Sequence, residues 1–521
     1  MSKHNFIHKA LLLIACLMPH FAVWGQDSGS EFWKGDIKYR VLQNEQEVEV
    51  IGLNYRYGVY EIQIPSIVTV PATDWNNKTF TVTTIGDKAF RYCEGLISIH
   101  LPNSVTTIEN NAFYSCSGLT SITVDSENTN YSSSNGVLFD KAQQLLIKCP
   151  EGKYGLYQIP NSVTTIGDSA FWSCDRLTSV NLPNSVTTIG NGAFNECYGL
   201  TSINLSNSVT RIGDEAFRSC RGLESIHIPN SVTTIGDNAF YRCERLNNIT
   251  VDSENTNYSS SDGVLFDKAQ QLLMLCPEGK NGVYQIPNSV TTIGDGAFSD
   301  CSGLESIHIP NSVTTIENRA FLGCSRLESI HIPNSVTTIG NRVFSYCYGL
   351  ESIYIPNSVT TIGDYAFYYC IGLKSVNLPN SVTTIGDYAF LRCEGLTSIH
   401  IPNSVTMIGS CIFKGCSGLE TLYFHSINPP TITDKYFGEF FTPQTIYVPQ
   451  EAVATYQATE PYNRYNIQGM DESTGIGEVE TPEAPPSGNI YDFNGRLVRT
   501  DGNLQALPKG IYILNGKKVV R

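Results

Sequence analysis

One pattern of apolar and polar positions recurs along most of the chain, I-P-N-S-V-T-T-I-G-D-x-A-F-x-x-C-x-G-L-x-S-I-x. In the copy at residues 304–309 apolar Leu and Ile point to one side, while Glu305 and His308 point to the other. This alternation predicts a short strand with one buried face. Pro310 lacks an amide donor and closes that strand. Val313 and Ile316 then turn back toward the core.

The cysteine of the unit sets the period. Neighbouring cysteines are 23 residues apart within each run, and two gaps of 58 residues break the series. Each gap holds one longer unit of 35 residues, at 124–160 and 251–287. The two long units are nearly identical and lie 127 residues apart, so a block of several repeats has been duplicated as a whole.

A period of 20–29 residues with this apolar spacing is typical of a leucine-rich repeat. No single coil buries its own apolar face, so the coils must stack. We expect Ala297, Phe298 and Cys301 to fill the side opposite the strand, and Gly294 to allow a tight corner. The predicted fold is an α/β-type, β-rich repeat solenoid, a right-handed coil stack with β caps and a small carboxyl-terminal β module.

The motif I-P-x-S-V-T-x-I-G-x-x-A-F-x-x-C-x-x-L over residues 83–424 resembles the BspA-like (Treponema pallidum-type) leucine-rich repeat family of bacterial surface proteins. The long units resemble the extended repeats of that family. The resemblance implies a non-enzymatic surface protein that binds host matrix or other cells.

The ends of the chain differ from the repeat. Residues 26–82 alternate as a hairpin-like β cap, and residues 425–470 predict a second cap with a strand at 445–449 and a short helix near 451–459. Residues 471–488 are linker-like. Residues 489–521 hold two Asn-Gly turns between alternating strands and resemble the carboxyl-terminal sorting domain of the type IX secretion system. That resemblance implies passage across an outer membrane.

The amino terminus has the form of a secretory signal peptide. Lys3 and Lys9 precede an apolar run that Pro19 ends, and small residues follow up to Gly25. We place cleavage after Gly25, which gives a signal peptide at residues 1–25. A lipoprotein box with Cys16 lipidated is the alternative. Both interpretations predict export. The outer-membrane cell surface of a Gram-negative bacterium is the location that the two resemblances imply.

Charge and composition narrow the possible partners. The formal net charge is -15, and only 16% of residues are charged. This balance opposes nucleic-acid binding through a general basic surface. No segment reaches the roughly 18 apolar residues of a membrane helix, so membrane association would come only through surface anchoring.

The sequence carries no recognisable catalytic or cofactor motif, so we predict no enzyme activity, no cofactor and no metal. Five histidines share one outward repeat position, and a glutamate column lies three residues before it. A metal or pH-sensitive strip at Glu305, His308, Glu328 and His331 is one interpretation. A solvated strand face with cross-strand charge pairs is the other.

The 16 cysteines suggest disulfides at first, but their identical inward positions favour a ladder of buried thiols. Cys411 instead occupies an outward position and is predicted to be an exposed thiol. The predicted structural ladder comprises Cys93, Cys116, Cys174, Cys197, Cys220, Cys243, Cys301, Cys324, Cys347, Cys370, Cys393 and Cys416.

Tyrosines concentrate between residues 346 and 388 and suggest a surface for a partner, with packing between coils as the alternative. The favoured function is adhesion of a monomeric surface protein to an unidentified protein, which the family resemblance implies to be one of the host extracellular matrix. Capture of a glycan or nutrient is the first alternative, and an enzyme accessory role is the second. The candidate binding face comprises Glu305, His308, Glu328, His331, Glu351, Tyr354, Tyr365, Tyr369 and Tyr388.

Overall fold

The computed structural model describes residues 29–54, 60–70, 77–433 and 445–470, and four strands between residues 490 and 520. The predicted signal peptide and linker lie outside these residues. The chain divides into two compact units, each described separately. The first comprises Met1–Ile399, Ser404–Leu419 and Thr431–Phe441, and the second comprises His400–Asn403, Glu420–Pro430 and Thr442–Arg521.

The first unit begins with a β cap that is larger than the predicted hairpin. Strands β1, β2 and β3 pair antiparallel, and β3 then pairs parallel with β6. Strand β6 pairs antiparallel with β5 and parallel with β8, which starts the repeat ladder. The strands are β1 (Glu31–Lys34), β2 (Ile37–Val41), β3 (Glu47–Leu53), β5 (Ile67–Thr69), β6 (Thr79–Ile85) and β8 (Thr107–Ile108).

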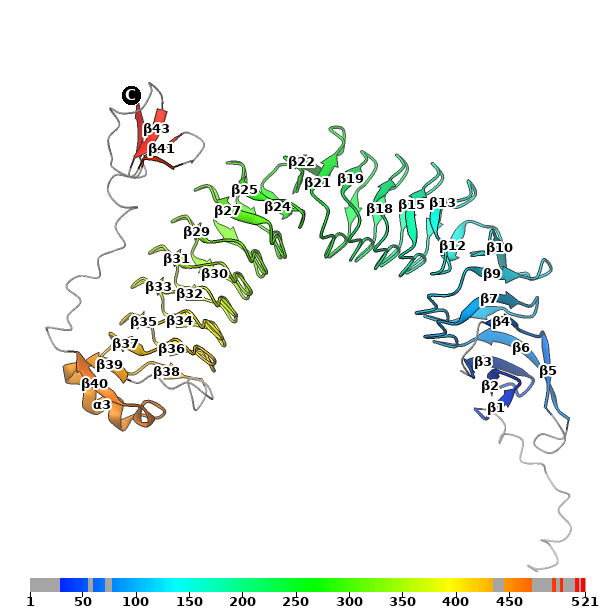
Figure 1. Cartoon of the computed structure of the whole chain (residues 1–521), viewed down its shortest axis with the longest axis horizontal. Helices are drawn as coiled ribbons and strands as arrows, with labels where there is room; N and C mark the ends of the chain where they lie inside the picture. Colours follow the sequence, from blue (N-terminus) through cyan, green and yellow to red (C-terminus); the bar gives the residue numbers. More distant parts are fainter. Residues whose placement is uncertain are drawn as a thin grey trace, which may run out of the picture. The chain divides into compact units, whose positions relative to one another are not determined.

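The S-I-x segments of successive repeats form one series of parallel strands, here called the S-I ladder (Figure 1). Its residues pair in register, for example Ser352 with Ser375 and Ile353 with Val376. In the first unit it comprises β4 (Tyr60–Gln63), β7 (Leu96–Leu101), β9 (Ser121–Val124), β13 (Gly155–Gln158), β15 (Leu177–Asn181), β17 (Ser202–Asn204), β19 (Ser225–Ile228), β21 (Asn248–Val251), β25 (Gly282–Gln285), β27 (Leu304–His308), β29 (Ser329–His331), β31 (Ser352–Tyr354) and β33 (Ser375–Asn377).

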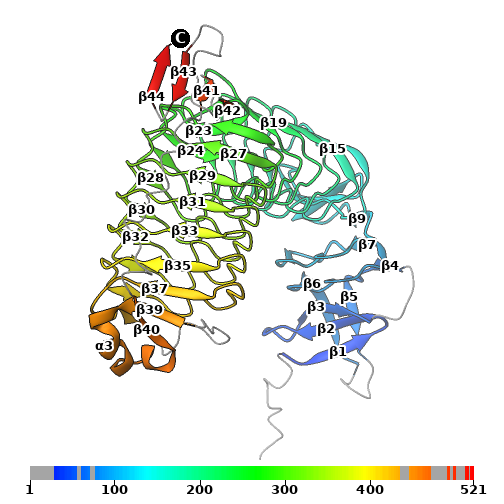
Figure 2. The ribbon, with the colours of Figure 1, turned by 60° about the vertical axis from the view of Figure 1, so that its left-hand side comes forward.

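The T-I pairs form a second parallel series, the T-I ladder, whose later strands Figure 2 shows in order. It comprises β12 (Leu145–Lys148), β14 (Thr165–Ile166), β16 (Thr188–Ile189), β18 (Arg211–Ile212), β20 (Thr234–Ile235), β24 (Leu272–Leu275), β26 (Thr292–Ile293), β28 (Thr315–Ile316), β30 (Thr338–Ile339), β32 (Thr361–Ile362), β34 (Thr384–Ile385), β36 (Met407–Ile408) and β38 (Thr431–Ile432).

The core lies between the two ladders and a third side made of the A-F-x-x-C turns. Repeated Leu, Ile, Val and Phe side chains are buried there. The Phe rings stack from coil to coil with centroids 4.7 Å apart at Phe171–Phe194 and 5.2 Å apart at Phe194–Phe217. The predicted β-rich solenoid is confirmed, but the repeats in the described residues contain no helix, because the A-F-x-x-C segment runs as turns.

The ladder cysteines occupy the buried end of each A-F-x-x-C turn. The thiol of Cys220 donates to the carbonyl of Phe194 at 3.1 Å, and that of Cys370 donates to the carbonyl of Phe344 at 3.0 Å. Burial raises the pKa of the Cys347 thiol to about 12, so the proton needed for such a bond is retained. No disulfide joins any of the cysteines from Cys93 to Cys416 that the structure describes.

The glycine after each T-I pair allows neighbouring coils to approach closely, and it does not form a left-handed corner. The prediction that Gly294 allows a tight corner was therefore wrong. At each of these glycines a Cβ would lie between 2.4 and 3.0 Å from the nearest atom of the neighbouring segment. A Cβ on Gly213 would lie 2.6 Å from Asn191 Oδ1, and one on Gly294 would lie 3.0 Å from the carbonyl oxygen of Leu273. The space is filled by an Asx ladder, in which the amide of Asp214 donates to Asn191 Oδ1 at 3.0 Å.

The backbone is left-handed instead at two positions of each A-F-x-x-C turn. Tyr365 and Tyr388 precede the Ala and have φ of 56°. Tyr346 and Tyr369 precede the Cys and have φ of 61° and 58°. β-branched residues are disfavoured in this region, and none occupies these positions among the left-handed residues of the described chain.

Each long unit adds a hairpin and loses a turn. In the first, β10 (Tyr131–Ser134) and β11 (Val137–Asp140) pair antiparallel, and β12 follows. The second repeats this with β22 (Tyr258–Ser261), β23 (Val264–Asp267) and β24. Buried Asn128 ties the hairpin to the coil before it, since its Nδ2 donates to the carbonyls of Pro102 and Val105 at 2.9 Å.

In the second unit the parallel pairing continues beyond residue 424, where we expected the repeat to end. Strand β37 (Thr421–Phe424) pairs with β39 (Thr445–Pro449), which pairs with β40 (Ile467–Met470). The strand spacing therefore outlasts the sequence motif. The predicted short helix is α3 (Val453–Ala458), between the 3-10 turns η1 (Gln450–Ala452) and η2 (Tyr462–Arg464).

Near the carboxyl end, strands flank both Asn-Gly pairs as predicted. Strand β41 (Ile490–Asp492) pairs antiparallel with β42 (Leu497–Arg499) and β43 (Ile511–Leu514), and β43 pairs antiparallel with β44 (Lys517–Val520).

The burial of the cysteines generates a testable prediction. In the native protein a thiol reagent should label Cys411, which is half-buried, and spare the fourteen buried cysteines of the described chain. Unfolding in denaturant without reductant should expose those fourteen to labelling, as counted by mass spectrometry. A count in denaturant that rises only after reduction would instead show disulfides.

Candidate functional site

Six of the nine predicted site residues lie on the outward face of the S-I ladder. Glu305, His308, Glu328, His331, Glu351 and Tyr354 are all exposed. His331 pairs across the ladder with Tyr354, and their rings stack with centroids 5.9 Å apart. Glu351 forms an ion pair with Lys374 at 2.8 Å. The side chains therefore form a column of polar and aromatic contacts between neighbouring coils.

The electrostatics of this column oppose a cationic histidine strip. Burial and the neighbouring His308 lower the pKa of His331, which favours its neutral form. No group of three or more His, Cys, Asp or Glu side chains in the described part of the chain is placed to hold a metal ion. The column therefore fits the solvated strand face with cross-strand pairs better than the metal strip.

The second unit holds an aromatic column that sequence reasoning missed. His400 stacks on Tyr423 with centroids 4.3 Å apart, and Tyr423 stacks on Tyr447 at 5.1 Å. His400 Nδ1 and His425 Nε2 are 3.1 Å apart. Burial first, and His425 second, lower the pKa of His400 to about 4. His425 escaped notice because it lies 25 residues after His400, outside the 23-residue period.

The other three predicted site residues, Tyr365, Tyr369 and Tyr388, lie on the A-F-x-x-C turns. Tyr365 stacks on Tyr388 with centroids 4.8 Å apart, and Tyr369 contacts Tyr368 edge to face at 4.6 Å. Guanidinium groups cover part of the rings, with Arg342 4.6 Å from the Tyr365 centroid and Arg392 5.3 Å from that of Tyr369. We call this cluster the tyrosine surface; its tyrosines are Tyr346, Tyr348, Tyr365, Tyr368, Tyr369 and Tyr388.

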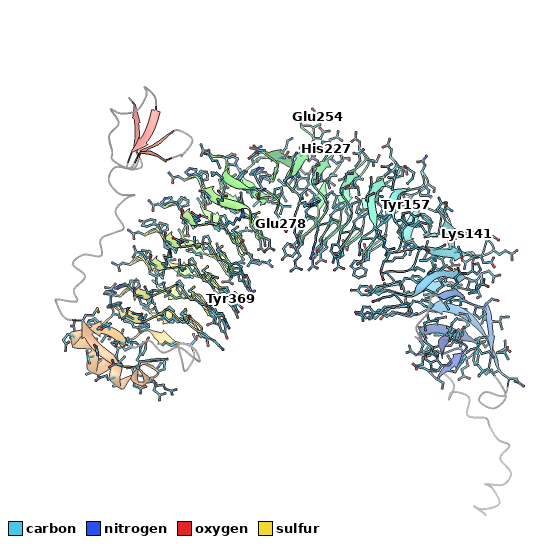
Figure 3. All side chains as sticks on the ribbon, in the orientation of Figure 1. Lys141, Tyr157, His227, Glu254, Glu278 and Tyr369 are labelled. Atoms are coloured by element: carbon cyan, nitrogen blue, oxygen red, sulfur yellow. The ribbon has the colours of Figure 1, made fainter. Side chains whose placement is uncertain are left out.

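We had expected the nine candidate residues to form one face. They do not. Figure 3 shows Tyr369 and Glu278 on one side of the first unit, and His227 of the S-I ladder on the opposite side. The strand alternation correctly indicated which residues point outward. It could not indicate that two outward positions of the same 23-residue unit lie on different sides of the coil.

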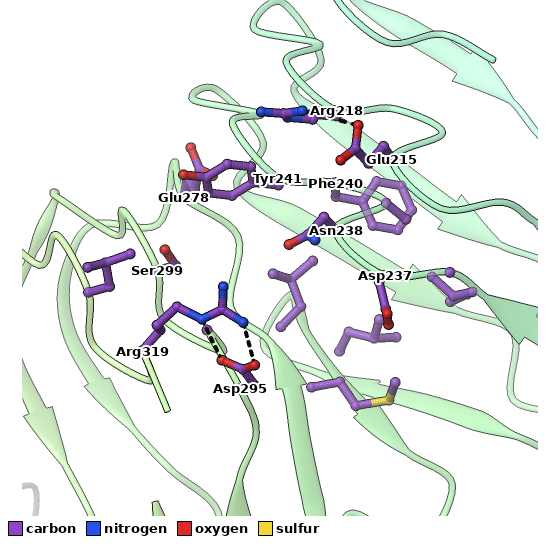
Figure 4. A pocket seen from close by; sticks show the side chains of 18 residues that line it. Glu215, Arg218, Asp237, Asn238, Phe240, Tyr241, Glu278, Asp295, Ser299 and Arg319 are labelled. Carbon is purple, nitrogen blue, oxygen red and sulfur yellow. Dashed lines mark hydrogen bonds and ion pairs between the residues drawn. The ribbon is translucent and has the colours of Figure 1, made fainter. Parts of the chain in front are cut away.

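Each long unit creates a pocket, which we had not predicted. In an ordinary unit Cys174 lies eight residues after Ile166. In the first long unit Cys149 lies only three residues after the equivalent Leu146. The G-D-x-A-F turn is therefore missing, and the turns before and after it leave a gap. The first gap pocket, whose lining residues run in the sequence from Ile108 to Trp172, has a volume of about 210 Å³. The second gap pocket, whose lining residues run from Glu215 to Leu322, has a volume of about 450 Å³ (Figure 4).

A buried glutamate lies beside each gap. Glu278 lines the second gap pocket and is 8% exposed, and Glu151 is 4% exposed. Burial raises the pKa of Glu278 to about 8 and that of Glu151 to about 7. Glu278 accepts a hydrogen bond from the amide of Arg242 at 2.5 Å, and Glu151 lies 3.7 Å from Lys148 Nζ.

Two ladders of short parallel strands with one apolar stripe per coil define a leucine-rich repeat protein. The model of the BspA type leucine rich repeat region (6 copies) matches residues 74–145, 155–262, 282–396 and 360–467. The chain belongs to this family, which is a scaffold family and not a catalytic one.

The chain is similar to solved structures of bacterial proteins. A leucine rich cell surface protein from Faecalibacterium prausnitzii is 29% identical over 76% of this chain and 95% of its own, with a TM-score of 0.50. A leucine-rich repeat protein from Bacteroides ovatus is 25% identical over 84% of this chain and 100% of its own, with a TM-score of 0.40. A comparison with curated protein sequences found no match. Among the described residues no helix is long and apolar enough to cross a membrane.

The buried Glu278 predicts a specific pH dependence of stability. Its folded pKa of about 8 lies above the ordinary glutamate pKa of 4.5, so ionisation opposes folding increasingly as pH rises from about 4.5 to 8. Glu278→Gln should therefore leave stability near that of the unmodified protein at pH 4.5. At pH 8.5 it should raise the free energy of unfolding by roughly 1–3 kcal/mol.

Urea unfolding of both proteins across this pH range measures the difference. Glu305→Gln, at an exposed carboxylate, is the matched control and should give a difference of about zero at both pH values. A Glu278→Gln variant less stable at pH 8.5 would show that the carboxylate supports folding when ionised.

Proposed function

We propose that this chain is an exported cell-surface protein that binds a protein partner through the tyrosine surface, in the manner of an adhesin. The observation that carries the proposal is the set of six half-buried or exposed tyrosines held in mutual ring contact on rigid turns. Ring contacts and left-handed turns fix the side chains before binding, which reduces the entropy lost on association.

The chemistry of this surface fits a protein partner. Tyr and Arg are enriched in interface hot spots, and Arg342 and Arg392 lie against the tyrosine rings. The neighbouring coils repeat the same geometry, so several weak contacts can act together along the stack. The similarity to a leucine rich cell surface protein supports the same location for this chain. An extracellular matrix protein of the host is the partner class that we propose.

The tyrosine surface predicts the effect of two substitutions. Tyr365→Ser with Tyr369→Ser should weaken binding to a matrix-protein array at least tenfold, because hot-spot aromatics contribute about 2 kcal/mol or more each. Tyr354→Ser is the matched control, since Tyr354 lies on the S-I ladder. It should leave binding unchanged.

The array should carry purified polysaccharides as a second arm. Binding to polysaccharide alone would favour the alternative of a glycan- or nutrient-capturing surface protein. Equal loss of binding for Tyr354→Ser and for the double variant would contradict the assignment to the tyrosine surface.

We further propose that residues 1–25 direct export and that residues 489–521 act as a type IX sorting module. Support comes from the amino-terminal sequence pattern and from the antiparallel strands β41 to β44. Deletion of residues 489–521 in a host with this secretion system should leave the protein in the periplasm, as detected by fractionation and surface proteolysis. Deletion of Val519 to Arg521 alone tests whether the terminal strand is needed, and unchanged surface display of the full deletion would contradict the role.

A further inference from the structure

The two gap pockets are one site present twice. Each of the thirteen residues that line the first gap pocket has its counterpart 127 positions later in the lining of the second. The duplicated block therefore offers an internal comparison, in which the surrounding coils follow the same pattern and six of the thirteen lining residues differ.

The first gap pocket is partly filled by its own side chains. Trp172 stacks on Tyr114 with centroids 4.0 Å apart. Lys148 Nζ lies 5.9 Å from the centroid of the Trp172 ring and 3.7 Å from Glu151 Oε1. The ammonium group thus lies between an aromatic ring and a buried carboxylate, and its aliphatic stem occupies the gap.

The second gap pocket lacks both of these groups. Ser299 stands where the first has Trp172, and Leu275 stands where the first has Lys148. The volume is about 450 Å³ instead of about 210 Å³. Glu278, the counterpart of Glu151, remains 8% exposed. Among the described residues no Lys, Arg or His forms an ion pair with it.

The remaining charges of the second gap pocket do not replace the missing cation. Arg218 pairs with Glu215 at 3.1 Å, and Arg319 pairs with Asp295 at 2.6 Å, so both guanidinium groups are engaged. Asp237 stands where the first pocket has the neutral Asn110. With four carboxylates and two guanidinium groups, the lining has a formal charge of -2.

Apolar groups line the rest of the second gap pocket. Phe240 ends the Phe stack of the preceding coils, because its ring contacts Phe217 at 5.6 Å on one side and the gap on the other. Leu265 and Met274 of the long unit complete the apolar part of the lining. A ligand must therefore combine a positive charge with apolar surface.

We propose that the second gap pocket binds a primary ammonium group on an unbranched aliphatic stem, the chemistry of a lysine side chain. The ammonium pairs with Glu278 as Lys148 Nζ pairs with Glu151, and the stem lies against Phe240, Leu265 and Met274. The proposal rests on the pocket alone and is independent of the tyrosine surface.

Protonation of Glu278 competes with the ligand, because the ammonium binds the ionised carboxylate. Affinity therefore rises with pH toward about 8 and levels off above it, where Glu278 is already ionised. The charged groups that act on Glu278 are Arg242, which favours ionisation, and Asp300 and Glu244, which oppose it.

The probe is Nα-acetyl-lysine methylamide, titrated by calorimetry or NMR into the chain from residue 26 to 521 at pH 8.5 and low salt. We expect one site with a millimolar dissociation constant, as for a ligand of this size. Nα-acetyl-norleucine methylamide, which lacks the charge, should bind at least tenfold more weakly. Equal binding of the two probes would overturn the proposal.

The chain supplies its own matched variants. Leu275→Lys with Ser299→Trp rebuilds the first gap pocket at the second position and should abolish binding. Lys148→Leu with Trp172→Ser opens the first gap pocket and should raise the stoichiometry from one to two. Glu278→Gln should weaken binding at least tenfold and remove its pH dependence. Unchanged binding in Glu278→Gln, or in the closed Leu275→Lys and Ser299→Trp variant, would overturn the proposal, and circular dichroism checks that each variant is folded.

Discussion

The structure depends on one constraint, which is that many polar groups of each coil find their hydrogen-bond partners on the neighbouring coil. The Cys thiol donates to a Phe carbonyl of the preceding coil, as Cys220 does to Phe194 at 3.1 Å. The Thr hydroxyl does the same, as Thr210 Oγ1 donates to the carbonyl of Thr187 at 3.2 Å. Buried polar groups without partners are costly, so the repeat must keep its length. Cys, Ser, Thr, Asn and Asp recur at the positions that make these bonds.

The same constraint determines where the sequence is free to vary. Outward positions on the S-I ladder and on the turns do not contribute to the apolar core, and there the chain places His, Glu, Arg and Tyr. The left-handed turn positions add a restriction, since they disfavour β-branched side chains. This restriction is met by Tyr365, Tyr369 and Tyr388. The rings of Tyr365 and Tyr388, which are 23 residues apart, stack between successive coils. A binding surface can therefore arise on these turns without cost to the core.

Much of the fold could be predicted from the sequence because the repeat is regular. Alternation around Ile307 and His308 located the strands, and the spacing of the cysteines gave the coil length. The site was less predictable, since the nine candidate residues share outward positions but lie on two sides of the coil. The role of Gly294 was also misjudged, because close approach by a neighbouring coil is not visible in one unit alone. His425 contacts His400 from two residues beyond Tyr423, which holds the repeat position, so the strict period concealed it.

The gap pockets follow from a deviation that the sequence does contain, the shortened segment from Leu146 to Cys149. That deviation removes one turn from the stack, and the two copies solve the resulting problem differently. In the first, Trp172 and Lys148 occupy part of the space, and Lys148 pairs with Glu151. The first gap pocket thus shows that side chains can occupy the gap without disturbing the fold. The open second gap pocket is therefore not imposed by the coil geometry. An uncompensated buried carboxylate opposes folding when it ionises, and Glu278 is retained despite that cost. A group that supplies the missing positive charge from outside the coil would remove the cost, and this couples occupancy of the second gap pocket to the stability of the surrounding repeats.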